Sequence, residues 1–556
     1  MTPILPKLQS PDKTESTFHS SQAHEKDPSL RAQPAGTSSA SSIDDDEQQM
    51  AAFGYKSQLA RRWHSVESFA VSFCAMNFIG ATRGTIFLGV LAGGPAAAWS
   101  SALISWIFMG VTAAVLAEIC SALPLSGSIY IWAAEAAGPK HARLVGFVVA
   151  WWACTAWMTS VGSSMQGIAY YILSQLVVWE VDFPGGVDIN NVKFRVVVWA
   201  VSEVLLIMVV ALNYLPPKAY SRVFKFSMCL MLLDFVLCTI WLPIRVHQTY
   251  GFRTPQEVFT GQYNGTGAPA GWNWMLSFLY GTSSVVGFDA SGHVAEELKN
   301  ASTVAARGIL LSQLVTGGCA FAATILWLFC TPPLEVWFDF YAPQPFVQIY
   351  ALALGKGPSV FMTILAVIGL ILNASIATVA ASRLVFAVAR DGVLPFSSWV
   401  GTVTQDGRPK NAVTVMYCFG AILLCTILPS NVAFTSLVSA GGIPTIAAYA
   451  LIAFCRLVFT STSFKNTRFG LGIFARPFYL IAFLWNGVVF AVYASPFSFP
   501  TSGKTFNYAS VIFGGATLFG ILTWWLTPAE AWLPRKRIDK IEEETEHGPN
   551  EESHKA

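Results

Sequence analysis

Long apolar runs alternate with short polar stretches along most of the chain. Each run reaches the ~20 residues that a membrane-spanning helix needs. The runs lie near 66–91, 96–122, 144–177, 196–214, 222–244, 272–295, 309–330, 357–389, 412–429, 431–456, 471–495 and 508–527. This pattern predicts an all-α polytopic membrane protein with about twelve transmembrane helices.

Polar segments flank the apolar region on both sides. Residues 1–60 are rich in Ser, Pro, Gln, Lys and Asp. A segment of this kind buries too little apolar surface to offset its ordering entropy, so we expect a disordered tail. The predicted organisation is a tail over 1–60, a transmembrane domain over 61–527 and a second tail over 528–556.

Composition supports the membrane assignment and excludes other classes. Hydrophobic residues make up 54% of the 556 residues and charged residues 12%, with a net charge of +2. No clustered basic and aromatic pattern suggests nucleic acid binding. The ten cysteines lie in apolar runs without a C-x-x-C pair, and no metal site or cofactor is predicted. No metalloprotease, serine-hydrolase or P-loop motif is present, so we do not expect an enzyme.

Charge distribution predicts the orientation. Lys and Arg residues concentrate in the loops on the side of the N-terminal tail, for example Arg61, Arg390 and Arg537. Cytosolic loops are enriched in these residues, so both termini are expected in the cytosol. The sequon at Asn264 then falls in the outside loop 245–271, where it is a candidate glycosylation site. The plasma membrane is the expected location, with the vacuolar membrane as the alternative.

The first and sixth apolar runs contain helix-weakening residues. The first contains Gly80 and Gly84, and the sixth contains Gly281, Gly287 and Gly292. Glycine is about 1 kcal/mol less favourable than alanine in a helix. Interrupted spans at matching positions of two inverted halves indicate a binding site at the membrane midplane. The alternative is that these small residues only permit close helix packing.

Three motifs resemble one family of transporters. They are "AEICSALPLSGSIYIWAAEAAGPK" at 117–140, "GFDASGHVAEELKNAS" at 287–302 and "ASRLVFAVARDGVLPFS" at 381–397. Together they resemble fungal GABA and choline permeases of the amino acid–polyamine–organocation superfamily. The resemblance implies a five-plus-five inverted-repeat core like that of LeuT, two extra helices, and a site at broken helices one and six with contributions from the third, eighth and tenth.

These expectations give a set of candidate site residues. The substrate-binding candidates are Ile79, Gly80, Ala81, Thr82, Arg83, Gly84, Gly281, Thr282, Ser283, Gly287 and Phe288. Asp289 and Lys225 are candidates for ion coupling or charge pairing, and Trp157 is a candidate pocket wall. Phe288 is also a candidate gate or cation–π surface, with ordinary packing as the alternative for both aromatic residues.

Arg83 departs from the Gly/Ser-rich break of this family. A charge at membrane depth is costly unless it is paired or faces water. Arg83 is therefore interpreted as a ligand for a substrate carboxylate, as a buried partner of Asp289, Glu203 or Asp234, or as a side chain that reaches an outer vestibule.

Other ionisable residues have open roles. Asp289 is a candidate for proton coupling, a counter-charge for Arg83, or a cap for unwound backbone. Lys225 is interpreted mainly as a positive-inside anchor, and His293 as a packed neutral side chain rather than a proton relay. Glu118, Glu296 and Glu297 are expected to form salt bridges at the cytosolic side. These carboxylates are expected to act at an inside gate rather than to bind substrate.

The function predicted from these features is secondary transport. We expect a proton-coupled importer of an amino acid or a GABA-like amine in the lipid bilayer. A choline or polyamine carrier of the same fold, or a non-transporting nutrient sensor, are the alternatives.

Overall fold

The computed structural model describes residues 50–51, 55, 58–429, 431–460, 467–503, 505–528 and 532. Most of both predicted tails lies outside these residues. Tyr55 and Leu59, inside the predicted N-terminal tail, are buried against the helices. The packed region therefore begins upstream of residue 61, because apolar and aromatic side chains of this segment pack against the helices.

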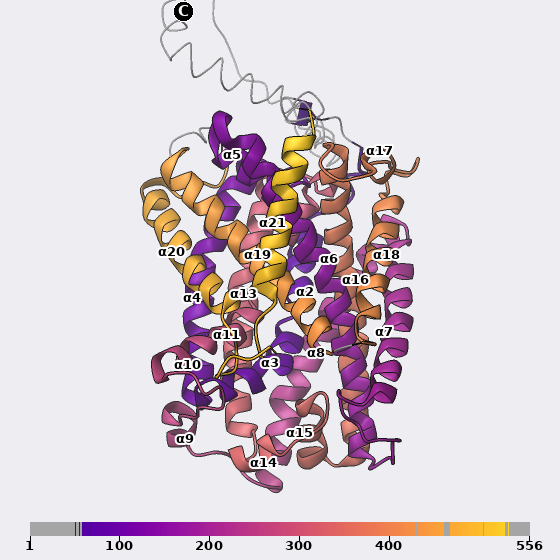
Figure 1. Cartoon of the computed structure of the whole chain (residues 1–556), viewed down its shortest axis with the longest axis vertical. Helices are drawn as coiled ribbons and strands as arrows, with labels where there is room; N and C mark the ends of the chain where they lie inside the picture. Colours follow the sequence, from indigo (N-terminus) through magenta and orange to yellow (C-terminus); the bar gives the residue numbers. More distant parts are fainter. Residues whose placement is uncertain are drawn as a thin grey trace, which may run out of the picture. The chain divides into compact units, whose positions relative to one another are not determined.

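Within the described residues, ten helical segments are long and apolar enough to cross a membrane. Figure 1 shows them packed side by side as a helical bundle. The first consists of α2 (Ser65–Met76) and α3 (Phe78–Leu91), and the others are α4 (Gly94–Ala122), α6 (Gly138–Val178), α7 (Val192–Asn213), α8 (Pro217–Gln248), α13 (Ala301–Cys330), α16 (Lys356–Arg390), α19 (Asn431–Val458), α20 (Ala475–Ala494) and α21 (Ala509–Leu526). The all-α polytopic fold is confirmed.

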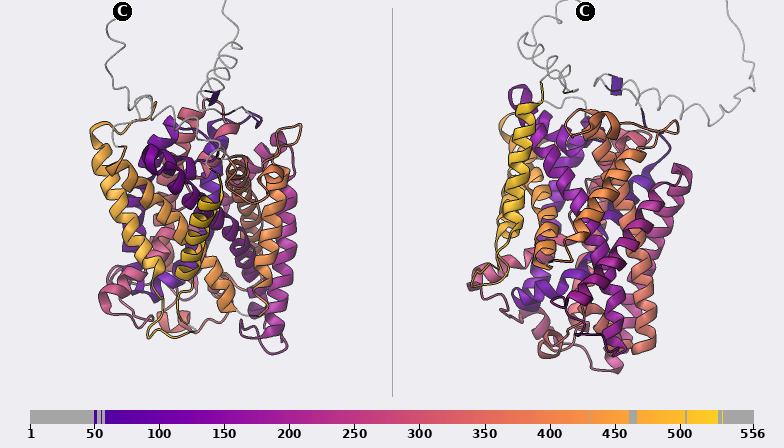
Figure 2. Two further views of the ribbon diagram at one scale, coloured as in Figure 1. Left: turned by 45° about the horizontal axis from the view of Figure 1, so that its top comes forward. Right: turned by 45° about the vertical axis from the view of Figure 1, so that its right-hand side comes forward.

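Two further predicted spans are present in modified form. The run at 412–429 forms the shorter helix α18 (Lys410–Cys425), and the run at 272–295 is interrupted. The last helix of the chain to cross the membrane, α21, is largely exposed and lies at the edge of the bundle in the right-hand view of Figure 2. Its apolar surface is suited to contact with lipid.

The first span is broken, but not where its glycines predict. Asn77 separates α2 from α3 and adopts a left-handed conformation, with φ of 45°. Asparagine tolerates this conformation, and its Oδ1 accepts a hydrogen bond from the Gly80 N–H at 3.3 Å. The predicted break at 79–84 is wrong, since these residues are helical. A Cβ on Gly80 would lie 2.8 Å from Leu370, so Gly80 serves close packing.

The sixth span is broken as predicted. It consists of α10 (Ala270–Leu276), α11 (Phe278–Ser283), a non-helical stretch over 284–289, α12 (Ala290–His293) and the 3₁₀ turn η1 (Ala295–Glu297). Gly287 has φ of 103°, a conformation that glycine adopts without strain. The two broken spans are joined by Ser72, whose hydroxyl donates to the Phe288 carbonyl at 2.7 Å and accepts from the Ser291 N–H at 2.9 Å.

Short helices lie at matching positions in the order of elements. Helix α5 (Ile129–Ala136) precedes the long helix α6, and α15 (Pro345–Leu354) precedes the long helix α16. Figure 1 shows α5 and α15 at opposite ends of the bundle. This is the placement expected of two halves with opposite orientation, in agreement with the predicted inverted repeat. The remaining short helices are α9 (Pro255–Thr260), α14 (Leu334–Phe338) and α17 (Ser397–Val400).

The end of the bundle that carries Trp63 and Glu297 is sealed, and we call it the tail end. The N–H groups of Arg62 and Trp63 donate to the Glu297 carbonyl at 3.0 Å, and the Lys299 N–H donates to the Trp63 carbonyl at 3.0 Å. These bonds tie the N-terminal segment to the end of the sixth span. The opposite end, which carries α14 and α15, is called the α15 end.

Candidate functional site

A cavity of about 790 Å³ lies beside the break in the first span. Its walls come from α3, α6, α16 and the loop that leads into α15. Its volume falls in the range typical of small-molecule sites. The lining residues that bear polar or aromatic groups are Asn77, Thr85, Phe87, Ser163, Ser164, Tyr170, Tyr171, Ser283, Gln344 and Asn373.

The cavity lining has a distinct chemistry. It offers hydroxyl groups, amides and aromatic rings, and no Lys, Arg, Asp, Glu or His is among the described residues that line it. Figure 1 shows α3 and α15, which border it, toward the lower end of the bundle. The cavity therefore lies toward the α15 end, away from the sealed tail end.

Arg83 lies in a buried ion pair behind the cavity wall. Its Nη1 and Nη2 donate to the two carboxylate oxygens of Asp234 at 3.0 and 2.6 Å, and Nη1 also donates to the Tyr350 hydroxyl at 2.7 Å. Of the interpretations left open by the sequence, the structure shows the pair with Asp234, and neither Asp289 nor an outer vestibule. Arg83, Asp234 and Tyr350 join α3, α8 and α15, because each helix contributes one of these side chains.

Asp289 lies at the break of the sixth span and is fully buried. Its carboxylate accepts hydrogen bonds from the Tyr449 hydroxyl and, at 3.3 Å, from Trp157 Nε1. Its Oδ2 also lies 2.9 Å from His293 Nε2, although the angle is poor for a hydrogen bond. Asp289 is therefore not the counter-charge of Arg83, since its neighbours are different groups.

The predicted substrate-binding residues separate into three groups. Gly80, Ala81, Gly84 and Ser283 line the cavity. Ile79, Thr82, Arg83, Gly281 and Thr282 are buried in helix packing outside its lining. Gly287 and Phe288 lie at the sixth-span break, where a Cβ on Gly287 would lie 3.9 Å from Met76 Cγ. Met76 also lines the cavity, so its side chain lies between the cavity and this break.

The aromatic residues near the break pack against one another. Phe288 stacks on Tyr449 with ring centroids 5.1 Å apart, and the ring of Trp157 meets His293 edge to face at 5.2 Å. Neither Phe288 nor Trp157 is among the residues that line the cavity. Trp157 is thus a neighbour of Asp289 in this structure.

The remaining charged candidates lie toward the tail end. Lys225 is exposed and pairs with Glu67 at 3.2 Å, in agreement with its interpretation as an anchor. The predicted gate carboxylates form ion pairs: Glu297 with Arg383 at 2.6 Å, Glu296 with Arg390 at 2.9 Å, and Glu118 with Arg456 at 3.8 Å.

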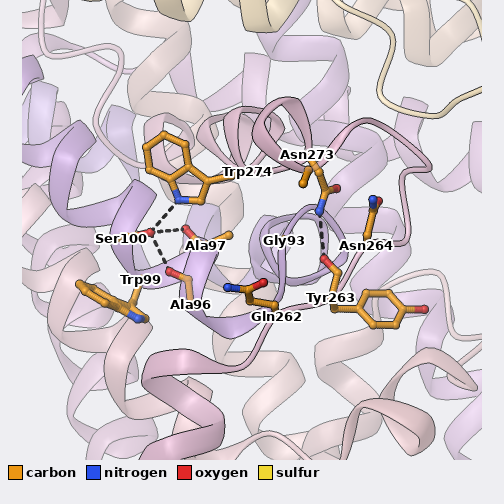
Figure 3. Close-up of a pocket in the computed structure, with 11 residues that line it drawn as sticks. Gly93, Ala96, Ala97, Trp99, Ser100, Gln262, Tyr263, Asn264, Asn273 and Trp274 are labelled. Carbon is orange, nitrogen blue, oxygen red and sulfur yellow. Dashed lines mark hydrogen bonds between the residues drawn. The ribbon is translucent and has the colours of Figure 1, made fainter.

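A second hollow, of about 650 Å³, lies between the start of α4, the loop 262–264 and α10. Figure 3 shows Trp274 Nε1 donating to the Ser100 hydroxyl and Asn273 donating to the Tyr263 carbonyl. Asn264, the candidate glycosylation site, is exposed at its edge, and its Nδ2 donates to the Ala268 carbonyl at 2.8 Å. Glycosylation of Asn264 stays a prediction.

Several residues of these sites carry no signal in the sequence. Tyr350 lies in a segment read as a loop, and Tyr449 is one tyrosine within a long apolar run. Only folding brings Tyr350 to Arg83 and Tyr449 to Asp289. Asn77 carried a weak signal, because asparagine is enriched at left-handed positions.

Comparison with known proteins agrees with this architecture. The profile of the family described as amino acid permease matches residues 65–517. The chain is 43% identical over 529 residues to the thiamine transporter thi9 of Schizosaccharomyces pombe, covering 91% of this chain and 89% of the relative. It is 26% identical over 514 residues to the amino-acid permease BAT1 of Arabidopsis thaliana, covering 88% of this chain and 96% of the relative.

A solved structure has the same fold. A mutant of the Eremococcus coleocola manganese transporter superposes with a TM-score of 0.50 at 13% identity, covering 92% of this chain and 98% of the other. The family match extends across most of the chain and includes both broken spans and the cavity. The chain therefore belongs to the amino acid permease family and is a multi-pass membrane transporter.

Proposed function

We propose that this transporter imports thiamine or a closely similar heteroaromatic cation. Thiamine carries a permanently positive thiazolium ring and a pyrimidine, and it has no carboxylate. The proposal draws on the relative thi9, a thiamine transporter that shares 43% of its residues across nearly the whole chain. The amino acid or GABA-like substrate predicted from the motifs is the competing possibility, followed by choline.

The charge arrangement around the cavity carries the proposal. Both terminal nitrogens of Arg83 are occupied by Asp234, and Arg83 does not line the cavity. The guanidinium charge is therefore matched by a carboxylate of the chain and lies outside the cavity lining. A free carboxylate would meet no positive side chain among the lining residues.

The start of α3 gives a second argument. Backbone N–H groups at a helix N-terminus can bind an anion. Here the Asn77 side chain accepts from the Gly80 N–H and its carbonyl accepts from the Ala81 N–H at 2.8 Å. The Ala81 bond is the first regular bond of the helix, whereas the Gly80 N–H is an end donor that the Asn77 side chain already uses. This capping favours a substrate without a carboxylate.

The aromatic lining suits a flat cation. Phe87, Tyr170 and Tyr171 line the cavity beside the hydroxyl groups of Ser163 and Ser164. A ligand cation over an aromatic face gains about 0.5–2 kcal/mol. Arg83 already lies over the Tyr171 ring, 5.8 Å from its centroid, so Phe87 and Tyr170 are the rings that can hold the thiazolium. The hydroxyl groups can pair with ring nitrogens and the amine of the pyrimidine.

Coupling and location belong to the same proposal. We place the protein in the plasma membrane with both termini in the cytosol, following the distribution of Lys and Arg residues. The tail end then faces the cytosol, and the cavity faces outward. Import is coupled to proton entry. Asp289, at the sixth-span break, is the residue that binds the coupled proton.

The test is uptake of labelled thiamine, GABA and choline, side by side, at acidic external pH. The host is a yeast strain that lacks its own carriers for all three. We expect saturable thiamine uptake that excess unlabelled thiamine abolishes and excess GABA does not. GABA or choline uptake without thiamine uptake would overturn the substrate assignment. Surface-located protein that moves none of them would favour a sensor.

Tyr170 supplies a matched pair of variants for the same assay. Tyr170→Leu removes an aromatic face from the cavity, whereas Tyr170→Phe keeps the face and removes the hydroxyl. From the size of a cation–π contact we expect KM for thiamine to rise about 2–30-fold in the leucine variant. The phenylalanine variant should stay close to the parent chain. Equal effects of both variants would assign the contribution to the hydroxyl.

A further inference from the structure

Three buried polar side chains form a chain from the sixth-span break toward the tail end. Asp289 Oδ2 lies 2.9 Å from His293 Nε2, an ion-pair distance without a hydrogen bond in this state, so transfer of a proton between them requires a small rotation of the ring. The other ring nitrogen, Nδ1, lies 2.6 Å from the Ser128 hydroxyl. All three residues are 0% exposed. Ser128 belongs to the turn that precedes α5, more than 150 positions away in the sequence, so only the fold brings the chain together.

The first member of this chain, Asp289, is separated from the cavity by Met76. Met76 lines the cavity and approaches Gly287, two residues before Asp289. A shift of Met76 would therefore remove a side chain that separates Asp289 from the cavity. Helix α3 and the sixth-span break are the elements expected to move in a carrier with two broken spans.

The last member lies beside the ion pairs of the tail end. Two residues before Ser128, the Ser126 N–H donates to Glu296 Oε1 at 3.0 Å, and Glu296 pairs with Arg390. The polar groups thus extend through the closed half of the bundle, from the break to the seal.

The surroundings of Asp289 leave His293 as its basic neighbour. Helix α19 presents Tyr449, α6 presents Trp157, and α12 presents His293 itself. The two arginines of α16 have partners of their own, since Arg383 binds Glu297 and Arg390 binds Glu296. Among the described side chains in contact with Asp289, His293 is therefore the one that can accept a proton from it.

We propose that Asp289, His293 and Ser128 form the proton relay of this transporter. The inference rests on the proposed function, because it assigns residues to its proton coupling. A proton that first binds to the Asp289 carboxylate moves on to His293 Nε2, and Asp289 becomes ionised again. His293 passes its Nδ1 proton to Ser128 Oγ, and the Ser128 hydroxyl releases its own proton to water at the opened tail end. One proton enters and one leaves.

The order serine, histidine, aspartate also occurs in hydrolases, where the serine attacks a substrate. That role does not fit here. None of the three residues lines either described cavity, and the Ser128 side chain is enclosed by protein. A proton can pass along such a chain, whereas a substrate cannot reach its serine.

The test uses the full chain in liposomes, with an entrapped pH-sensitive dye. Gradient-driven accumulation of labelled thiamine and the accompanying proton influx are measured together with counterflow, the exchange of labelled for unlabelled thiamine without a gradient. His293→Gln cannot accept a proton, and Ser128→Ala removes the hydroxyl. Both should lower accumulation and proton influx at least tenfold while counterflow persists. His141→Gln, a partly buried histidine of α6, should behave like the parent chain.

The outcomes separate the two proposals. A parent chain that exchanges GABA or choline instead of thiamine overturns the substrate only, and the relay is then measured with that solute. Parent-like proton influx in His293→Gln and Ser128→Ala overturns the relay, even if thiamine is transported. Loss of counterflow together with accumulation in both variants would also overturn it, because that result indicates a structural role. Asp289→Asn, measured in parallel, should show the same split as His293→Gln.

Discussion

At the scale of single residues, the buried cation Arg83 shows how context decides the role of a charge. The sequence identifies an arginine at membrane depth, and the fold supplies Asp234 and Tyr350 as its partners. Removal of one member of a buried ion pair leaves an uncompensated charge, whereas an apolar replacement of both is often tolerated.

This gives a prediction for the pair. Arg83→Met and Asp234→Leu should each lower the free energy of unfolding by about 3–5 kcal/mol, and the double variant should recover most of the loss. Thermal unfolding of the purified proteins measures the three differences. Additive losses in the double variant would show that the two charges do not depend on each other.

A second residue, Asp391, lies at the tail end just after α16. Burial raises its pKa to about 8, although the Tyr55 hydroxyl, which donates to its Oδ2 at 2.9 Å, acts in the opposite direction. The folded protein thus holds a proton that the unfolded chain, with a carboxyl pKa near ~3.9, releases at lower pH. The contribution of Asp391 to stability is therefore complete at low pH and declines as pH rises from about 4 to 8.

Asp391→Asn tests this effect, since the amide resembles the protonated carboxyl. We expect the variant to match the parent chain at pH 4 and below and to unfold at a higher temperature at pH 8 to 9. The difference between the two melting curves across this pH range is the measurement. A difference that does not change with pH would contradict the prediction.

At the scale of elements, one left-handed residue divides the first span. Asn77 turns the chain between α2 and α3 and also caps α3 through Gly80. Asn77 lies three residues before the first glycine of the run. A break predicted from the glycines therefore falls too far along the chain. The glycines pack against neighbours or line the cavity, and asparagine provides the turn.

Substitutions at Asn77 distinguish the turn from the cap. Asn77→Gly keeps the left-handed conformation and loses the side-chain cap, so the loss of stability should be small, at most about 1 kcal/mol. Asn77→Val forces a β-branched residue into that conformation and should cost about 1–3 kcal/mol and lower uptake. Melting temperatures and thiamine uptake are measured for both. Similar values for glycine and valine would exclude a requirement for the left-handed turn.

At the scale of the whole molecule, the two ends of the bundle differ. The tail end is sealed by backbone bonds between Trp63, Glu297 and Lys299 and by arginine–glutamate pairs, while the cavity lies toward the α15 end. The structure thus has the features of an outward-facing carrier once the cytosolic side is assigned to the tail end.

Labelling of introduced cysteines tests this state. Ala81→Cys lies in the cavity lining and Ala295→Cys at the buried tail end. In a background without the exposed Cys229, Cys418 and Cys425, an impermeant maleimide added outside intact cells should modify Ala81→Cys much faster. Equal rates, or faster labelling of Ala295→Cys, would contradict the outward-facing assignment.

The sequence by itself determined the membrane-spanning helices, the interrupted sixth span and the carboxylates that form ion pairs at the tail end. These features follow from local properties: the length of apolar runs, the conformational freedom of Gly287, and charges placed at span ends. The sequence is enough to predict these features, because each feature depends only on neighbouring residues in the chain and on the bilayer.

Only the tertiary structure decided which residues share a site. The partner of Arg83, the neighbours of Asp289 and the contact of Ser128 with His293 join positions far apart in the chain. The physical reason is that a buried polar group must be satisfied by whichever element packs against it. The partner of each buried group depends on how α3, α6, α8, α15 and α19 pack together. It cannot be predicted from a local pattern of residues.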